Sequence, residues 1–225
     1  MSKIIDTWSK EPEHEDGMTD EHAWIWREII AAVPPIPLGG KVLDVGCNQG
    51  GFLRMLYDHS PFSTGVGIDL ARDAIAHAEA RKEGRPLRYL ATTKISDAGT
   101  GFDAAFSHEV IYLVRDLVDH ARQVADALAP GASYHAVTCC HSDSPLWATW
   151  RPMIAQFSNI YVPNHSVDDI ASAFRAARFE VSLKRFLANA SIPMEDGPSA
   201  YFPTDRDRLE TYTRWKLLFT CRKPT

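Results

Sequence analysis

The chain has 225 residues, of which 45% are hydrophobic and 24% are charged, and its formal net charge at neutral pH is −5. This length and apolar share fit a single compact α/β domain over residues 1–225. An acidic chain with scattered basic residues lacks the basic face of a nucleic-acid-binding protein, and no stretch is long and apolar enough to span a bilayer. We therefore expect neither nucleic acid nor a membrane as a partner.

The first expected element is a helix over residues 20–33, which ends before two prolines. A buried strand follows at residues 41–45, then a glycine-rich turn and a second helix over residues 50–59. Strand, turn and helix in this order are typical of a Rossmann-type ligand-binding loop.

The turn carries the run Val42-Leu43-Asp44-Val45-Gly46-Cys47-Asn48-Gln49-Gly50. Glycines at a turn accept positive φ and let a ligand approach the backbone closely. A dinucleotide loop needs glycine at its middle position, where the backbone almost touches a pyrophosphate, and this chain has Asn48 there. The carboxylate of Asp44 at the strand tip suits a cofactor with a cationic amino-acid end and no phosphate. S-adenosylmethionine fits this description.

A second strand ends in another acid, within the run Gly65-Val66-Gly67-Ile68-Asp69-Leu70, and an amphipathic helix follows it. Asp69 stands 25 positions after Asp44, close to the interval of about 20 residues between a glycine loop and a ribose-binding acid. Because a carboxylate accepts hydrogen bonds from both ribose hydroxyls, we expect Asp69 to bind the ribose of the cofactor. The alternative, an acid favoured at a helix N-terminus, is compatible with this role.

The remaining chain alternates between strands and helices, which predicts a mainly parallel sheet with helices on both faces. The expected strands are 87–92, 102–107, 132–140, 179–187 and 211–221, with helices at 116–128 and 166–178. Residues 141–164 and 189–207 fall outside this alternation and carry many aromatic side chains. Long loops at the carboxyl ends of parallel strands are where α/β enzymes bind ligands. We therefore expect these two insertions to shape a mostly apolar substrate pocket.

The four cysteines are Cys47, Cys139, Cys140 and Cys221, and no two of them form a C-x-x-C pair. The adjacent pair falls on an expected strand, where neighbouring side chains point to opposite faces. We therefore expect no metal site and no disulfide framework. The first residues also lack the apolar core of a secretory signal, so the expected compartment is the reducing cytoplasm.

The run from Val42 to Gly50 resembles the first signature motif of the class I S-adenosylmethionine-dependent methyltransferases, and the Phe102-Asp103 start of the fourth strand resembles the strand-four signature of that family. The resemblance implies a Rossmann-like three-layer sandwich, with a mostly parallel seven-stranded sheet in the order 3-2-1-4-5-7-6 and an antiparallel strand 7. The commonest family sequence has glycine where this chain has Asn48. Asparagine is among the few residues that tolerate left-handed backbone, so the loop shape should survive.

The same resemblance implies which residues hold S-adenosylmethionine and its product S-adenosyl-L-homocysteine. The loop would lie beside the methionine portion, Asp69 on the ribose, Leu70 against the adenine face and the two threonines near the adenine edge. The full expected set is Asp44, Gly46, Cys47, Asn48, Gly50, Asp69, Leu70, Thr92, Thr93, Ser107 and His108. Residues 1–38 carry three tryptophans and are expected to form a helical lid over the cofactor. For any single tryptophan, capping of the core is the simpler explanation.

Methyl transfer from a sulfonium depends largely on holding the nucleophile and the methyl carbon together, and a base is needed only if the acceptor must lose a proton. His108 follows the fourth strand and is the first candidate for a proton acceptor or substrate contact, with His141 and Tyr112 after it. The alternative for His108 is that it only lines the cofactor site. The run Ser107-His108-Glu109-Val110 is not the Asn/Asp-Pro-Pro-aromatic run of many nitrogen methylases that act on nucleic-acid bases.

The expected function is transfer of a methyl group from S-adenosylmethionine to an O or N atom of a small molecule, with an aromatic or heterocyclic acceptor as one class. The alternatives are an NAD-linked Rossmann-fold oxidoreductase and a non-catalytic protein that retains the fold. Asn48 disfavours the first alternative, and the intact cofactor motifs disfavour the second. The expected partner is the small-molecule substrate, with the chain as a monomer or homodimer.

Overall fold

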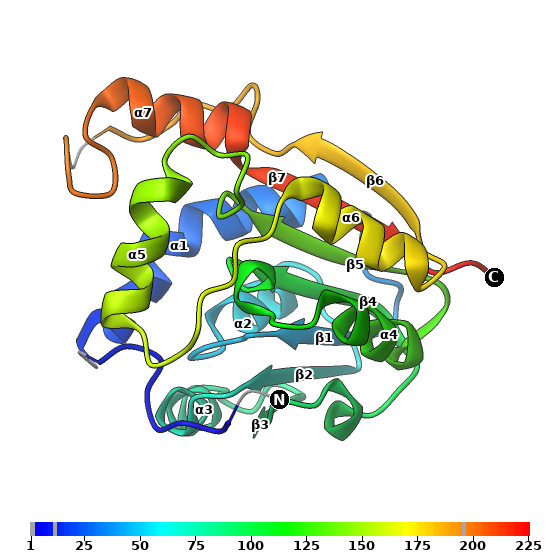
Figure 1. Ribbon diagram of the computed structural model, residues 1–225. Coiled ribbons are helices and arrows are strands. Elements are labelled where there is room, and N and C mark those ends of the chain that lie inside the picture. Colours follow the sequence, from blue (N-terminus) through cyan, green and yellow to red (C-terminus); the bar gives the residue numbers. More distant parts are fainter. Residues whose placement is uncertain (1–2, 11–12, 195–196) are drawn as a thin grey trace.

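The computed structural model describes residues 3–10, 13–194 and 197–225, with the side chains of residues 13–21 excepted. Its centre is a seven-stranded sheet in the order β3-β2-β1-β4-β5-β7-β6 (Figure 1). β7 pairs antiparallel with β5 and β6, and the other neighbouring strands pair in parallel. The predicted sheet order and the reversed strand are confirmed. The strands are β1 Lys41–Val45, β2 Thr64–Asp69, β3 Leu87–Ala91, β4 Phe102–His108, β5 Leu128–Thr138, β6 Glu180–Arg185 and β7 Leu217–Arg222.

Helices cover both faces of the sheet and complete the three layers (Figure 1). One face carries α1 (Glu13–Ala32), α2 (Gly51–His59) and α3 (Arg72–Ala80), and the other carries α4 (Leu117–Ala127) and α6 (Val167–Ala176). The first predicted insertion contains α5 (Trp147–Phe157), and α7 (Asp205–Glu210) begins at the end of the second. Within the described residues, no helix has the length and apolar character needed to cross a membrane.

The central strand β1 is buried from both sides, which explains its continuous apolar sequence. Val42 and Leu43 are both 0% exposed, yet they belong to different core clusters because neighbouring side chains point to opposite faces. Val42 belongs to the cluster with Phe52 of α2 and Phe106 of β4, and Leu43 to the cluster with Phe174 of α6. Parallel strands covered on both faces have this pattern.

Two predicted strand boundaries are wrong. The segment Thr211–Trp215 was expected to begin strand seven and is a π-helical turn instead, because the N–H of Lys216 donates to the carbonyl of Thr211 at 2.7 Å. β7 begins only at Leu217. β5 begins at Leu128 rather than at residue 132, since it follows α4 directly and accommodates Pro130-Gly131 at a register shift against β4.

The first helix is also longer than expected, because α1 begins at Glu13 rather than at residue 20. The segment before it, residues 3–10, joins two distant parts of the sheet edge. Ile5 forms a parallel bridge with Ala71 at the start of α3, and Ser9 forms an antiparallel bridge with Ser158 after α5. The segment therefore runs from the end of β2 to the first insertion. Positions 1–2 and 11–12 of the predicted lid, and 195–196 of the second insertion, lie outside the described residues.

Phe174 tests the packing of α6 on the sheet. Its ring is 0% exposed and stacks on Tyr134 with ring centroids 5.4 Å apart. Phe174→Ala should lower the free energy of unfolding by about 3–5 kcal/mol, because removal of a buried aromatic ring leaves a cavity. The control Val118→Ala, at a side chain of α4 that is 46% exposed, should change it by less than about 0.5 kcal/mol. Urea denaturation measures both, and equal losses would contradict the described packing.

Candidate active site

The glycine loop between β1 and α2 has the left-handed backbone that its sequence predicts. Gly46, Asn48 and Gly50 have φ values of +75°, +46° and +72°. The N–H groups of Gly46 and Cys47 both donate to the carbonyl of Ile68 in β2, at 2.8 and 3.0 Å. Asparagine therefore keeps the loop shape at the position where glycine is common in the family.

Glycine is also required in this loop by packing. A Cβ atom on Gly46 would lie 2.3 Å from a methyl group of Val110, which follows β4, and one on Gly50 would lie 2.5 Å from the ring of Tyr89 in β3. Neither distance allows a side chain. A larger residue at Gly46 would therefore displace Val110 as well as any ligand, so this position is a poor probe of binding alone.

Asp44, in β1, carries a buried carboxylate that has no partner among the described residues. The residue is 4% exposed, and its carboxylate has neither a hydrogen bond nor an ion pair within the described part of the chain. Burial, and to a smaller extent the charge of Asp69, raises the pKa of Asp44 from 3.8 to about 8. A buried acid of this kind suits a cationic ligand, and the ammonium and sulfonium groups of S-adenosylmethionine are cations. The residues present thus fit that cofactor.

Asp69 ties the glycine loop to the end of β2. One carboxylate oxygen accepts the backbone N–H of Asn48 at 3.0 Å, and the other accepts that of Ala71 at 2.9 Å. Burial raises the pKa of Asp69 above 3.8, although these hydrogen bonds act in the opposite direction. Each oxygen retains a further lone pair. The carboxylate can therefore accept hydroxyl groups as well as hold the loop.

The other predicted cofactor residues near Asp69 differ in whether their polar groups already form hydrogen bonds. The Leu70 carbonyl accepts an N–H of the N-terminal segment at 3.0 Å. The Thr92 hydroxyl donates to the carboxylate of Asp97 at 2.5 Å, whereas Thr93 is half-buried and follows at the same strand end. The Cys47 side chain is buried. Leu70 directly follows β2, and Thr92 and Thr93 directly follow the neighbouring strand β3.

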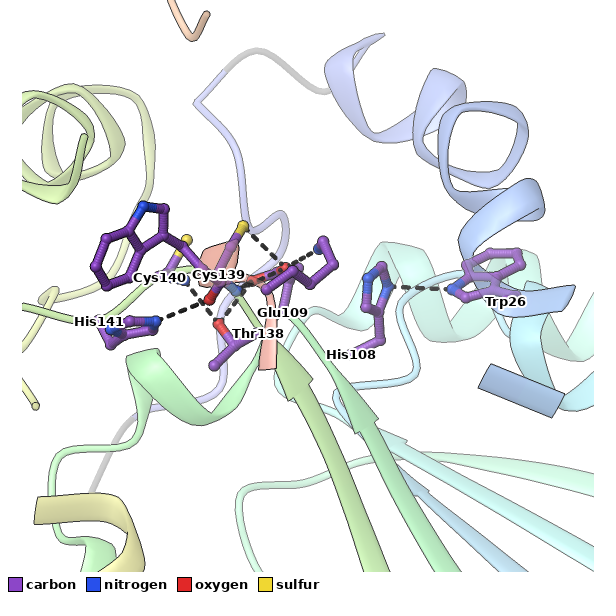
Figure 2. A network of polar contacts seen from close by, with 9 residues as sticks. Trp26, His108, Glu109, Thr138, Cys139, Cys140 and His141 are labelled. Atoms are coloured by element: carbon purple, nitrogen blue, oxygen red, sulfur yellow. Dashed lines mark hydrogen bonds and ion pairs between the residues drawn. The ribbon is translucent and has the colours of Figure 1, made fainter. Parts of the chain in front are cut away.

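His108 ends β4 and contacts α1. The indole N–H of Trp26 donates to its Nδ1 at 3.2 Å (Figure 2), and the ring of His22 meets it edge-on with centroids 4.9 Å apart. Because Nδ1 accepts, the neutral ring carries its proton on Nε2, which is buried and lacks a hydrogen-bond partner among the described residues. Burial, together with the charge of Lys216, holds the pKa of His108 well below 6.5. His108 is therefore a neutral hydrogen-bond donor.

Ser107, the residue before it, is committed to the interior of the sheet. Its hydroxyl lies 2.6 Å from the hydroxyl of Tyr134, which in turn lies 3.2 Å from Nε2 of His120. Ser107 still lines the small space beside Asp44, so its position, rather than its hydroxyl, contributes to the site.

An ion pair that the sequence analysis missed joins the carboxyl-edge segments next to β4, β5 and β7. Lys216 is 2% exposed, pairs with Glu109 and lies 5.4 Å from the centre of the Tyr212 ring. The Glu109 carboxylate also accepts the hydroxyl of Thr138 at 2.7 Å, and the backbone N–H and thiol of Cys139 at 3.2 and 3.3 Å. Figure 2 shows this group beside His108. We call it the Glu109–Lys216 pair.

Glu109 reaches these partners through an unusual backbone conformation. Its φ is +52°, which is uncommon for a residue other than glycine and is found at functional sites. Burial acts to raise the pKa of Glu109, but the charge of Lys216 outweighs it and lowers that pKa to about 2. The pKa of Lys216 lies above 10.5 despite its burial, because Cys139 and Glu109 favour the charged form. Both groups are therefore charged at neutral pH.

The cysteine prediction is wrong in one respect. β5 ends at Thr138, so Cys139 and Cys140 lie beyond the strand and do not alternate between its faces. Ligand atoms of Glu109, Cys139 and Cys140 all lie within 4.8 Å of one another, which is a possible metal geometry. The ammonium of Lys216 already pairs with the carboxylate of this group, so a cation is present without a metal ion.

The other two catalytic candidates lie away from His108. His141 is 1% exposed; its Nε2 donates to the carbonyl of Trp215 at 2.9 Å, and its Nδ1 is 3.6 Å from the carboxylate of Asp143. In Figure 2 it stands on the far side of the two cysteines from His108. Tyr112 packs edge-on against Trp147 at 5.7 Å, and burial raises its pKa well above 10. The structure thus brings His108, but not these two, beside Asp44.

The space beside Asp44 is small and is covered by α1. It has no room for even one water molecule and is lined by Ile29, Asp44, Phe52, Phe106, Ser107 and His108. Sites for small molecules usually enclose about 300–1,000 Å³. α1 supplies Ile29 here and Trp26 and His22 over His108, so this helix covers the space beside Asp44.

Comparison with known proteins assigns the family. The model of a methyltransferase domain family matches residues 20–183, which is most of the chain and includes both acidic strand ends. The chain belongs to this family, and its sheet order and motifs are those of the class I S-adenosylmethionine-dependent methyltransferases.

Individual relatives match over shorter stretches. An uncharacterised methyltransferase of Mycobacterium tuberculosis is 31% identical over 108 residues, which are 46% of this chain and 53% of the relative. A tRNA U34 carboxymethyltransferase of Hydrogenovibrio crunogenus is 30% identical over 140 residues, 57% of this chain and 42% of the relative. The chain spans about half the length of the curated relatives it matches.

A solved structure supports the fold over nearly the whole chain. A methyltransferase in complex with the Haloferax volcanii Trm112 methyltransferase activator superposes with a TM-score of 0.80 at 23% identity, and the match covers 95% of each chain. At this identity the similarity establishes the shared architecture.

Asp44→Asn separates the effect of the buried carboxyl group on stability from its effect on cofactor binding. An acid whose pKa is raised on folding loses stability as the pH rises from about 3.8 through about 8, because ionisation then favours the unfolded chain. The variant cannot ionise there, so it should be more stable than the parent above pH 8 and should bind S-adenosylmethionine more weakly. Thermal unfolding across the pH range and calorimetry measure the two effects. The exposed control Asp73→Asn should change neither, and an unaltered stability profile in Asp44→Asn would contradict the account.

Proposed function

We propose that this methyltransferase transfers the methyl group of S-adenosylmethionine to an oxygen or nitrogen atom of a small-molecule acceptor. The observation that carries the proposal is the buried carboxylate of Asp44, which has no partner among the described residues and lies on the strand next to the one that ends in Asp69. A cation suits the first acid and a ribose diol suits the second. The pyrophosphate of NAD would instead lie near an uncompensated acid.

The cofactor roles follow from this arrangement. The backbone of the loop from Gly46 to Gly50 would face the methionine portion, and Asp44 would balance its positive charge. Asp69 would accept the ribose hydroxyls, with Leu70 against the adenine face and Thr93 near the adenine edge. Thr93 suits the edge better than Thr92, because the Thr92 hydroxyl already donates to Asp97.

When bound, S-adenosylmethionine supplies an electrophilic methyl carbon on a positively charged sulfur. The contribution of the chain is to hold the acceptor in line with that carbon and to exclude water. α1 would provide the exclusion, since Trp26 and His22 cover His108. His108 would contact the acceptor as a donor through Nε2–H. A role as base would require the proton to leave Nε2, and the described tautomer and low pKa disfavour it.

Two observations favour a small molecule over RNA as the acceptor, although two of the relatives are tRNA U34 carboxymethyltransferases. The chain has a net charge of −5 and a pI of about 6.0, whereas RNA-binding surfaces are basic. The first insertion also contributes to an apolar cluster around Tyr112, Trp147 and Trp150, which suits a small, partly apolar acceptor. His141 and Tyr112 would form part of the surface that contacts the acceptor.

Asp69→Ala tests the ribose assignment. It should weaken the binding of S-adenosyl-L-homocysteine by about 1.5–3 kcal/mol, because hydrogen bonds to a charged acceptor are lost. The 2′-deoxyribose analogue should bind the parent more weakly than the natural ligand, and should lose less affinity in the variant than the natural ligand does. Equal losses of affinity for the analogue and the natural ligand in Asp69→Ala would mean that Asp69 only ties the loop to β2.

The function itself is tested by ligand-dependent stability followed by a product search. S-adenosylmethionine and S-adenosyl-L-homocysteine should raise the melting temperature and NAD should not, because a ligand stabilises the state it binds. A mass increase of one methyl group is then sought in pools of small molecules and in tRNA. Stabilisation by NAD alone, or methylation of tRNA alone, would contradict the proposal.

A further inference from the structure

The region around the Glu109–Lys216 pair holds more buried hydrogen-bond donors than acceptors to receive them. The ammonium of Lys216 has three N–H groups, and within the described residues Glu109 is its one acceptor. The Nε2–H of the adjacent residue His108 is buried without a partner there. Buried donors without acceptors are costly, so the region fits a ligand that brings oxygen lone pairs.

Glu109 does not offer a counterpart for an amine. Its two oxygens already receive Lys216, the hydroxyl of Thr138, and the N–H and thiol of Cys139. The unpartnered Nδ1 of His141 is an acceptor, but it lies 3.6 Å from Asp143 and beyond the cysteines in Figure 2. Beside His108, the groups that can still form hydrogen bonds are therefore donors.

The charges of the neighbouring side chains restrict the class of ligand further. Lys216 and Glu109 cancel each other, and burial keeps His22 and His108 neutral by lowering both pKa values, that of His22 to about 4. The remaining N–H groups of this one ammonium suit a monoanion, whose charge would lie beside the sulfonium of the methyl donor. A phosphate dianion would call for a second cation, and Lys216 is the one cation in contact with Glu109 among the described residues.

We propose that the methyl acceptor is a monocarboxylate, bound by the ammonium of Lys216 and the Nε2–H of His108, and that the product is a methyl ester. This inference rests on the proposed function. One carboxylate oxygen gives an electron pair to the methyl carbon, and the carbon–sulfur bond breaks with its electrons moving to sulfur. No proton is released, so the step needs no base. That agrees with a His108 that already carries its proton on Nε2.

Binding tests the assignment without turnover. Benzoate, phenylacetate and butyrate are titrated by calorimetry into the chain, with and without S-adenosyl-L-homocysteine, beside the matched amides, amines and phenyl phosphate. At least one carboxylate should bind, and its amide and amine should bind at least about tenfold more weakly. Preference for an amine, an amide or the phosphate would overturn the proposal, and so would the absence of binding by all three carboxylates.

Two single variants test whether Lys216 recognises the carboxylate or whether the Glu109–Lys216 pair only supports the local structure. Lys216→Met should weaken carboxylate binding at least about tenfold. Glu109→Gln should strengthen it, because the competing carboxylate is removed and the ammonium remains. A purely structural pair would lose affinity in both variants. Lys41→Met, at an exposed side chain on the opposite end of β1, is the control and should bind as the parent does.

The double variant Lys216→Met/Glu109→Gln guards against misfolding, since it leaves no buried unpaired charge. It should bind S-adenosyl-L-homocysteine like the parent and fail to bind carboxylates. Carboxylate binding that survives in this variant would overturn the role of Lys216.

Turnover supplies a separate result. With methyl-labelled S-adenosylmethionine and a pool of carboxylic acids, the product should release labelled methanol on mild alkali, as an ester does and a methylamine does not. Alkali-stable product would overturn the ester and leave methyl transfer standing. Failure to bind S-adenosylmethionine or its product would instead remove the proposed function, and is measured independently.

Discussion

Burial of charge at the carboxyl edge of the sheet is the constraint on which the rest of the structure depends. Helices cover both faces, so a charged group at this edge has little access to water and needs a partner. The Asp69 carboxylate accepts two backbone N–H groups. The Glu109 carboxylate pairs with the ammonium of Lys216 and accepts a hydroxyl and the N–H and thiol of one residue. Asp44 has none of these within the described residues. The free-energy cost of burying the Asp44 carboxylate on folding is therefore the clearest indication that a ligand binds beside it.

The edge divides into two halves with different chemistry. β1 and β2 supply the acids and the glycine loop, where a cationic cofactor fits. The ends of β4 and β5, and the segment before β7, supply buried donors and an apolar wall, where an acceptor fits. Val110 links the halves, because its side chain fills the space next to Gly46 while Glu109, the residue before it, pairs with Lys216. The two halves therefore adjoin at Val110.

Much of the cofactor half could be predicted because its signals are local. A buried strand, an acid and left-handed loop positions occur within nine consecutive residues, and Asn48 adopts the backbone that its side chain tolerates. The sheet order followed from the family resemblance to this motif. The same locality explains the errors. The sequence predicted a strand from Thr211 and opposite faces for Cys139 and Cys140, but a single backbone hydrogen bond and an earlier strand end decide these segments.

The acceptor half could not be predicted, because its main interaction is not local. Glu109 and Lys216 are 107 positions apart and meet only because β7 inserts next to β5. A lysine between Trp215 and Leu217 could have been noted as a charge within an apolar segment. Its partner depends on the left-handed backbone of Glu109, which no pattern in the sequence marks. The tautomer of His108 likewise depends on Trp26 of a distant helix.

Direct titration of the Asp44 carboxyl by carbon-detected NMR tests the central claim, that this buried acid has no partner until a cationic cofactor binds. In the free protein its pKa should lie near 8, and saturation with S-adenosylmethionine should lower it, because a nearby cation favours the ionised form. A pKa near 4 in the free protein, or a pKa that S-adenosylmethionine leaves unchanged, would contradict the account.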